Sequence, residues 1–321
     1  MSEKKRFKKL QEGESYECSV LVMDMEDKKT VSRGFEKNYV RLSLSDGREI
    51  IQVNYFGITR ADIERLGVLE GSVADVIICR TNAYLNVVSI RPVQGKELSK
   101  EDFIQSAPEE PERIFNEIYE TIERTSHNEE FNMLSQLTIG MMDIYKSALI
   151  KAPAGKIIHH NMKGGLLFHT VRMLRSAELM CDVYENLDRE LMLCSCVLHD
   201  IGKVRELSID DLGNIDYTSE GRLLGHTALG MLMVSEYVSS MPDYDGERLK
   251  LVLHMIASHH GKKEYGAVAD PAIPEAVCLH ALDMQDCRIY QMEDQYKNIG
   301  PGEQSKKIYG LGNVTVYKPA D

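Results

Sequence analysis

Histidine and aspartate residues gather in one part of this 321-residue sequence, where nine of the ten histidines fall between residues 159 and 280. Imidazole nitrogens and carboxylate oxygens bind divalent metals, and a carboxylate can bridge two ions. Two ions a few ångströms apart can activate a water molecule and hold a phosphoryl group during its transfer. The ordered set that predicts a metal-dependent phosphodiesterase site is His169, His199, Asp200, His226, His259, His260 and Asp283.

Local spacing adds two expectations at this site. Lys203 follows Asp200 by three residues, which puts both side chains on one side of a helix. We therefore expect Lys203 to pair with that carboxylate or to meet a phosphate oxygen. Asp283 and Asp286 compete for the last ligand position, and we favour Asp283 because it directly follows the largely apolar run 276–282.

The remaining histidines have less specific surroundings. A single histidine on an apolar helix is more often a hydrogen-bonded packing residue than a ligand, and we interpret His254 and His280 in this way. His159 and His160 precede a pair of glycines at 164–165. They could contact substrate or close off the fold, and the functional interpretation is slightly favoured for His160.

The segments that must position these residues have helical periodicity. From residue 112 onward, apolar residues recur at helical spacing and strand signals are nearly absent. This pattern predicts an all-α helical bundle. The expected helices lie at 112–122, 129–149, 166–185, 188–203, 222–240, 245–258 and 274–292.

Residues 13–95 instead predict β-structure. Apolar and polar residues alternate there, and a Ser-Asp-Gly turn at 45–47 predicts a hairpin. Five strands with a short helix at 58–66 after the third strand are the layout of an OB-fold barrel. The expected strands lie at 16–23, 39–44, 49–56, 71–79 and 83–90. The predicted domains are a barrel with a basic N-terminal arm at 1–95, a linker at 96–111 and the bundle at 112–321.

Composition narrows the class of protein. No apolar run reaches the roughly 18 residues that span a membrane, and the basic start of the chain has no apolar segment behind it as a secretory signal would. The seven cysteines are scattered without a C-x-x-C pair, so we expect reduced thiols in a cytoplasmic protein. The net charge of −12 argues against a protein that coats nucleic acid through charge alone.

These motifs resemble a known superfamily. His169, the His199-Asp200 pair and Asp283 resemble the H…HD…D signature of the HD-domain metal phosphohydrolases, which are all-α bundles. The wider pattern resembles the YhaM family of 3′-to-5′ exoribonucleases, whose members carry an OB-fold before the HD domain. The resemblance covers nearly the whole chain, and the segments that carry it are 159–160, 164–170, 198–203, 220–226 and 258–261.

The resemblance implies a site and an activity. It implies that Asp200 bridges two ions and that Asp200 and Lys203 act in catalysis. The first ion would be held by His169, His199, Asp200 and Asp283, and the second by His226, His259 and His260. The ions would be two Mn²⁺, with Co²⁺, Fe²⁺ or Mg²⁺ as other divalent options. The substrate would be single-stranded RNA, with single-stranded DNA also attacked, and the products nucleoside 5′-monophosphates.

Two further questions concern the barrel and the alternatives. A track for a single strand needs basic groups for phosphates and aromatic faces for bases. The substrate-binding candidates are His160, Tyr39, Arg41, Tyr55, Phe56, Arg80 and Tyr84. The barrel could instead serve packing or dimerisation, and a homo-oligomer is one expectation. Alternative functions are an HD-domain hydrolase of a nucleotide or cyclic nucleotide, or a non-catalytic single-strand-binding factor.

Overall fold

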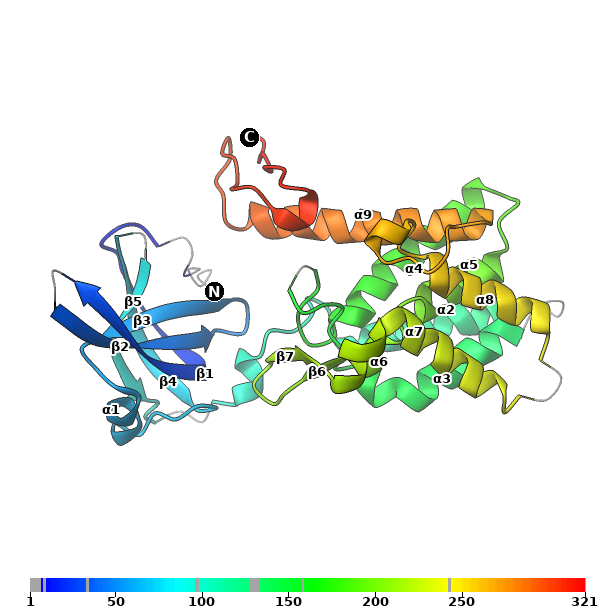
Figure 1. The fold of residues 1–321 in the computed structure, drawn as a ribbon. Helices are drawn as coiled ribbons and strands as arrows, with labels where there is room; N and C mark the ends of the chain where they lie inside the picture. Colours follow the sequence, from blue (N-terminus) through cyan, green and yellow to red (C-terminus); the bar gives the residue numbers. More distant parts are fainter. Residues whose placement is uncertain are drawn as a thin grey trace. The chain divides into compact units, whose positions relative to one another are not determined.

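The chain forms two compact units in a computed structural model (Figure 1). One unit comprises Met1–Ser106 with Asp210–Asn214, and the other comprises Ala107–Ile209 with Ile215–Asp321. Each unit has a hydrophobic core of its own. The structure describes residues 7, 10–32, 35–82, 84–95, 98–126, 133–157, 159–241 and 244–320. The basic residues of the N-terminal arm, Lys4, Lys5, Arg6, Lys8 and Lys9, lie outside these ranges.

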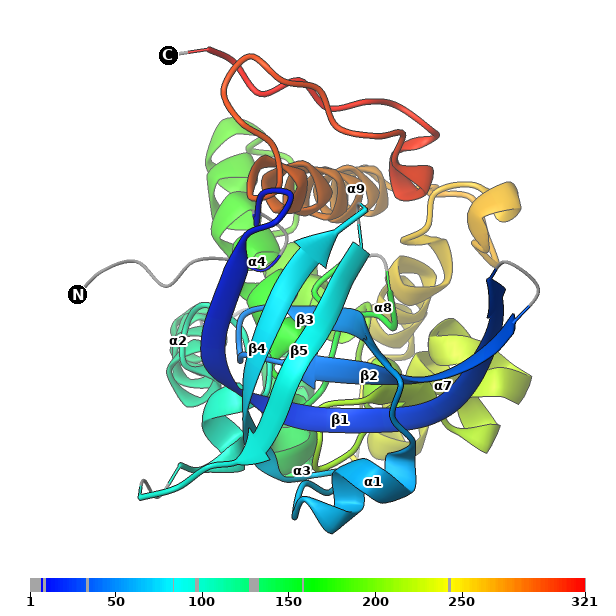
Figure 2. The ribbon, with the colours of Figure 1, turned by 90° about the vertical axis from the view of Figure 1, so that its left-hand side faces the viewer.

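The first unit is a closed barrel of five strands, with β4 and β5 side by side and β1 curving past β2 in Figure 2. Its order is β1-β2-β3-β5-β4, and β1 also pairs with β4 to close it. A short helix follows the third strand, as in an OB-fold. The predicted fold class of this unit is confirmed. Its elements are β1 (Ser15–Ser32), β2 (Phe35–Ser45), β3 (Ile50–Phe56), α1 (Arg60–Arg65), β4 (Val73–Thr81) and β5 (Tyr84–Pro92).

Strand periodicity explains most of the barrel. Val40, Leu42 and Leu44 of β2 are fully buried at alternate positions, which is the period-two pattern of a strand with one face in a core. β1 is much longer than its predicted range of 16–23. The run 24–29 is mostly charged and carries little strand signal, but its backbone pairs with β2 as far as Ser32.

The second unit is helical, as predicted, and its main helices are distributed over the right-hand part of Figure 1. The structure also contains a small hairpin that the sequence did not suggest. The predicted helix at 188–203 is divided in two, because the chain turns at 199–202. The elements are α2 (Pro111–Ser126), α3 (Met133–Leu149), α4 (Gly165–Val183), α5 (Arg189–Leu198), α6 (Lys203–Glu206), β6 (Leu207–Ile209), β7 (Ile215–Tyr217), α7 (Ser219–Val238), α8 (Gly246–Ser258) and α9 (Pro274–Tyr296).

Helix α5 is the centre of this unit. Asp188 caps its start by accepting a hydrogen bond of 2.9 Å from the amide of Leu191, and such a cap satisfies one of the free amides of the first turn. All side chains from Glu190 to Leu198 are buried. Since the helix runs through the core and ends at residue 198, the next two residues, His199 and Asp200, are delivered into the interior of the unit.

A close backbone approach fixes α7 against the turn after α5. A Cβ atom on Gly202 would lie 2.0 Å from the carbonyl oxygen of His226 and 2.6 Å from the amide nitrogen of Gly230. Gly225 has a φ of 73°, which interrupts the helical geometry of α7 and which side-chain-bearing residues rarely adopt. These two glycines therefore set where His226 enters the site.

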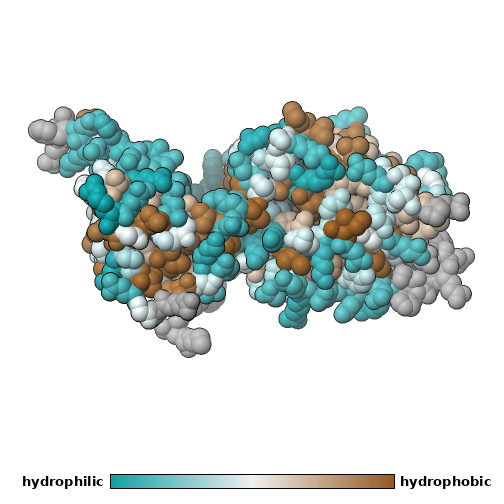
Figure 3. Space-filling model, turned by 90° about the horizontal axis from the view of Figure 1, so that it is seen from below, coloured by the Kyte–Doolittle hydropathy of each residue, from teal (hydrophilic) through white to brown (hydrophobic). Residues whose placement is uncertain are grey.

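The hydropathy of the surface, the length and polarity of the helices and the state of the cysteines are all in line with the composition. Hydrophilic residues cover much of the helical unit in Figure 3, with apolar residues in scattered patches. Within the described part of the chain, every helix is too short or too polar to cross a membrane. All seven cysteines are free thiols, as predicted.

The close approach at Gly202 gives a test of this packing. Gly202→Ala should lower the free energy of unfolding by about 1–3 kcal/mol, because the added methyl group has no room and the backbone of α7 must move. Urea denaturation followed by circular dichroism measures the change. Gly246→Ala is the matched control, since nothing lies within 4 Å of its added Cβ, and it should shift stability by no more than about 0.5 kcal/mol. Equal stability of both variants would refute the packing at Gly202.

Candidate metal centre

The seven predicted ligand residues gather inside the helical unit, although they come from five separate elements. His169 lies in the first turns of α4, His226 lies just after the interruption of α7, and Asp283 lies in the middle of α9. The two pairs lie at helix ends, His199 with Asp200 after α5 and His259 with His260 after α8. Helix ends place these pairs where the backbone can turn into the core.

Asp200 is at the middle of this cluster and is almost completely buried. Its Oδ2 lies 3.3 Å from Nε2 of His199 and 3.9 Å from Nε2 of His169. Its Oδ1 lies 3.4 Å from Nε2 of His226 and 3.7 Å from Nε2 of His259. The two oxygens of one carboxylate therefore face two different groups of imidazole nitrogens, which is the placement that a bridging ligand requires.

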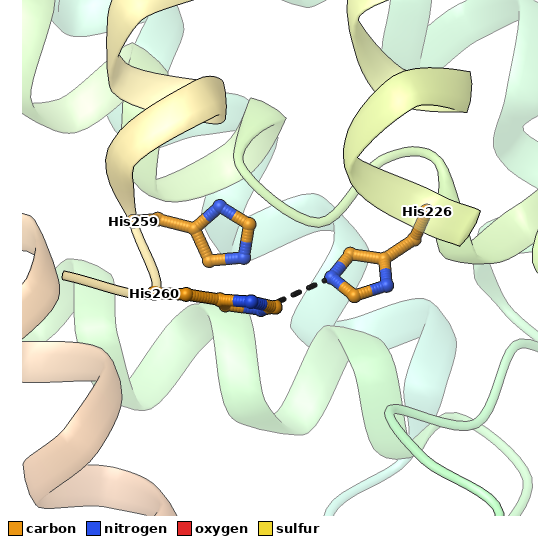
Figure 4. Close-up of side chains that lie close together, drawn as sticks. All are labelled: His226, His259 and His260. Carbon is orange, nitrogen blue, oxygen red and sulfur yellow. Dashed lines mark hydrogen bonds between the residues drawn. The ribbon is translucent and has the colours of Figure 1, made fainter. Parts of the chain in front are cut away.

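Each group has enough donors for an ion. The ligand atoms of His169, His199 and Asp200 lie within 4.8 Å of one another, and Oδ1 of Asp283 lies 3.4 Å from Nε2 of His169. On the other side of Asp200, the ligand atoms of His226, His259 and His260 also lie within 4.8 Å of one another. Figure 4 shows these three rings turned toward one point, with Nε2 of His226 and Nε2 of His260 3.3 Å apart.

Several of these donor atoms are buried without a hydrogen bond. The described residues provide no hydrogen-bond partner for Nε2 of His169, His199 and His259 or for Oδ1 of Asp200. Buried polar atoms are normally paired, and an unpaired one costs free energy. Divalent cations on the two sides of Asp200 would satisfy these atoms, so the donor set fits metal ions.

Backbone carbonyl groups orient two of the imidazole rings. Nδ1 of His199 lies 3.0 Å from the carbonyl oxygen of Cys196, and Nδ1 of His259 lies 2.7 Å from that of Ile256. A proton on Nδ1 is held by such a contact, which leaves the lone pair of Nε2 free for a metal. The same arrangement thus occurs at both helix ends.

Carboxylates orient two other rings. Nδ1 of His226 lies 3.1 Å from Glu206, and Nδ1 of His169 lies 2.8 Å from Asp286. Our sequence reasoning missed Glu206 and considered Asp286 only as a rival ligand to Asp283. The signal that points to Asp286 is its i, i+3 spacing from Asp283, but this spacing cannot tell which carboxylate lies in front of the ring and which behind it.

Charges in the cluster are strongly coupled. Burial opposes the charged form of His169, but Asp283 and Asp286 outweigh burial and raise the pKa of His169 to about 9. Burial also opposes ionisation of Asp200, yet Lys203 and His199 hold its pKa well below the usual range. The Nζ of Lys203 lies 2.5 Å from Oδ2 of Asp200. The cluster therefore favours ionised carboxylates that attract positive charge.

The other histidines occupy distinct places. His160 is fully buried and its Nε2 lies 2.7 Å from Asp286, so it lies behind His169 and its predicted substrate contact would need a change of conformation. His159 instead lines a pocket of about 340 Å³ next to the cluster. The rings of His254 and His280 are hydrogen-bonded to backbone groups, as the interpretation of both as structural residues expects.

The barrel residues predicted to contact single-stranded RNA lie on different β-strands and faces of the barrel. Tyr39 and Phe56 are cross-strand partners whose ring centroids lie 5.2 Å apart, and Arg41 follows two residues after Tyr39 on β2. Tyr55 packs partly against the barrel core, so it belongs to the opposite face of β3. The remaining two residues lie on the pair β4–β5, with Arg80 half-buried and Tyr84 66% exposed.

Comparison with known proteins identifies the class of this site. The model of the HD domain matches residues 166–285, the segment that holds all seven predicted ligand residues. The chain therefore contains an HD domain, which implies binding of divalent metal, and its histidines and aspartates form clusters able to hold it. An OB domain from Thermoplasma acidophilum covers 26% of this chain and 78% of its own, with 16% identity and a TM-score of 0.20, so the barrel assignment rests on its own strand order.

Curated relatives identify the family. The 3′-5′ exoribonuclease YhaM of Shouchella clausii is 34% identical over 290 residues, which cover 88% of each chain. The protein of that name from Listeria monocytogenes is 31% identical over 321 residues, which cover 98% of each chain. The protein of that name from Bacillus subtilis is 33% identical over 77% of each chain. This chain belongs to the YhaM family.

The contact between Asp286 and His169 predicts an effect on metal affinity. Asp286→Asn should raise the dissociation constant for Mn²⁺ about 10- to 100-fold, because a carboxylate behind a ligating imidazole fixes its orientation and raises its basicity. Equilibrium dialysis with Mn²⁺ measures this. Asp182→Asn is the matched control, since Asp182 is exposed and pairs with Arg189. Unchanged affinity in Asp286→Asn would exclude the orienting role.

Proposed function

We propose that this chain is a metal-dependent 3′-to-5′ exoribonuclease that shortens single-stranded RNA and releases nucleoside 5′-monophosphates. The observation that carries the proposal is the buried Asp200 carboxylate, whose two oxygens face two groups of imidazole nitrogens. Relatives in its family are named 3′-5′ exoribonucleases, and this supports the proposed cleavage of RNA from the 3′ end. The barrel of the first unit supports a polymeric substrate, because OB-folds commonly bind single strands.

The proposed ligand sets share Asp200. His169, His199 and Asp283 would complete one site, and His226, His259 and His260 would complete the other. Mixed nitrogen and oxygen donors suit Mn²⁺, and they also suit other divalent ions of the first transition row. When bound, the ions supply an activated water molecule and neutralise charge on the phosphate.

Residues of the chain itself contribute the rest of the chemistry. Lys203 keeps its ammonium group beside Asp200 and also lines the adjoining pocket, so it can donate a hydrogen bond to a phosphate oxygen as negative charge increases there. Burial disfavours its charged form, but Asp200 outweighs burial and raises the pKa of Lys203. The ammonium therefore stays protonated at neutral pH and remains a donor.

The barrel would bind the strand through stacking and charge. Tyr39 and Phe56 lie next to each other, and the Phe56 side chain is 49% exposed, so a base can stack on this pair. Arg41 lies on the same strand face and would meet phosphates. Stacking does not distinguish ribose from deoxyribose, so single-stranded DNA is proposed as a second substrate. A homo-oligomer stays a prediction.

A time course on a single-stranded RNA labelled at its 5′ end tests the proposed reaction. With Mn²⁺ we expect a ladder that shortens from the 3′ end, and EDTA should abolish it. Asp200→Ala should leave the strand intact and bind no Mn²⁺, because the variant lacks the carboxylate shared by both sites. An intact strand with the wild-type protein in Mn²⁺, or normal cleavage by Asp200→Ala, would contradict the proposal.

A substitution in the aromatic pair Tyr39 and Phe56 distinguishes a nuclease that acts on a polymer from a hydrolase that acts on nucleotides. Phe56→Ala should raise KM for a long single strand about 10-fold, since one base–aromatic stack contributes about 1–3 kcal/mol. Hydrolysis of bis(p-nitrophenyl) phosphate should not change. Leu69→Ala, at a 54% exposed position of the same unit, is the control and should match the wild type. No change in KM for Phe56→Ala would leave the barrel without its proposed role.

A further inference from the structure

A pocket of about 340 Å³ adjoins the metal centre, and the metal chemistry accounts for only part of its lining. Lys203, His226 and His260 lie on the side of the metal centre. The remaining wall comes from the segment before α4 and from the hairpin β6–β7. These residues are Ala154, Gly155, Lys156, Ile157, His159, Leu207 and Tyr217, with Glu206 beside His226.

His159 presents an unused polar atom in the wall of this pocket. Its Nε2 is buried, and the described residues offer it no hydrogen-bond partner. Its ring centroid lies 5.7 Å from that of His169, so the atom lies near the proposed first metal site. A buried nitrogen in this position is satisfied when a ligand brings a polar group to it.

Tyr217 and Lys156 form a more exposed part of the wall. The Tyr217 side chain is 40% exposed, and the Nζ of Lys156 lies 5.7 Å from its ring centroid. Asp216 binds Lys156 at 2.8 Å and Arg222 at 2.9 Å. Two cations therefore share one carboxylate beside this aromatic ring.

This combination matches one nucleotide. An aromatic face suits a base, a cation suits a neighbouring phosphate, and the buried donors near the metal centre suit the phosphate that is cleaved. Pockets that bury a small ligand have volumes of about 300–1,000 Å³. The present pocket is at the lower end of this range, which suits a ligand of about one nucleotide.

We propose that this pocket binds the 3′-terminal nucleotide of the strand, with its base stacked on Tyr217, its phosphate beside His159 and Lys203, and the preceding phosphate near Lys156. The inference rests on the proposed function and deepens it. A pocket that holds one nucleotide beside the metal centre explains why cleavage proceeds from an end. It also predicts little preference among the four bases, because each offers a face for stacking.

Binding of a reaction product, AMP, tests whether the pocket holds a nucleotide and does not require catalytic turnover. The dissociation constants of AMP and of ribose 5-phosphate are determined by calorimetry in the presence of Mn²⁺, for the wild type and for Tyr217→Ala. We expect Tyr217→Ala to raise the dissociation constant of AMP about 10-fold, since AMP has a base to stack. The dissociation constant of ribose 5-phosphate, which has no base, should change by no more than about 2-fold. Tyr217→Phe should restore AMP binding, and Tyr309→Ala, at an 84% exposed position of the same unit, should match the wild type.

The outcomes separate this inference from the proposed reaction. An equal loss of affinity for AMP and ribose 5-phosphate would show damage to the metal centre or to the fold. That result would overturn the stacking role of Tyr217. Unchanged AMP binding in Tyr217→Ala, or no AMP binding by the wild type, would overturn it as well. Failure of the RNA ladder concerns the reaction alone, because a base-dependent effect of Tyr217 on AMP binding would still support a nucleotide pocket.

Discussion

A carboxylate buried away from water is costly unless positive charge and hydrogen bonds compensate it, and Asp200 is such a carboxylate. Lys203 supplies one compensating charge at 2.5 Å. The imidazole nitrogens on both sides are also buried, and several make no hydrogen bond to the described residues. Cations at the centre would satisfy these atoms together, and the surrounding helices place the donors around that point.

The fold meets this requirement with rigid elements. Helix α5 is buried along nearly its whole length, so its C-terminal end brings His199 and Asp200 into the core without a flexible loop. Contacts to carbonyl groups one turn back hold Nδ1 of His199 and Nδ1 of His259. Since these contacts come from helix geometry itself, the ring orientation needs no additional residues. Positioning of this kind keeps donors ready before substrate arrives.

The sequence predicted the two units and the ligand types because both depend on local pattern. Alternation identified the barrel, and the spacing of histidines and aspartates identified the cluster. It did not reveal the orienting carboxylate Glu206 or the pocket wall at Tyr217, because both depend on contacts between distant segments. It also could not tell that His160 is buried, whereas His159 lines the pocket beside the metal centre. The two are adjacent in sequence, and only the packing around His160, which has a φ of 45°, separates their surroundings.

The position of bound manganese is the most direct test of this account. Anomalous diffraction from crystals of the full chain grown with Mn²⁺ would locate each ion. We predict two peaks that share Asp200, the first ligated by Nε2 of His169 and His199 together with Asp283, and the second ligated by His226, His259 and His260. Peaks beside Asp286 on the Nδ1 side of His169, or no peak next to Asp200, would contradict the central claim.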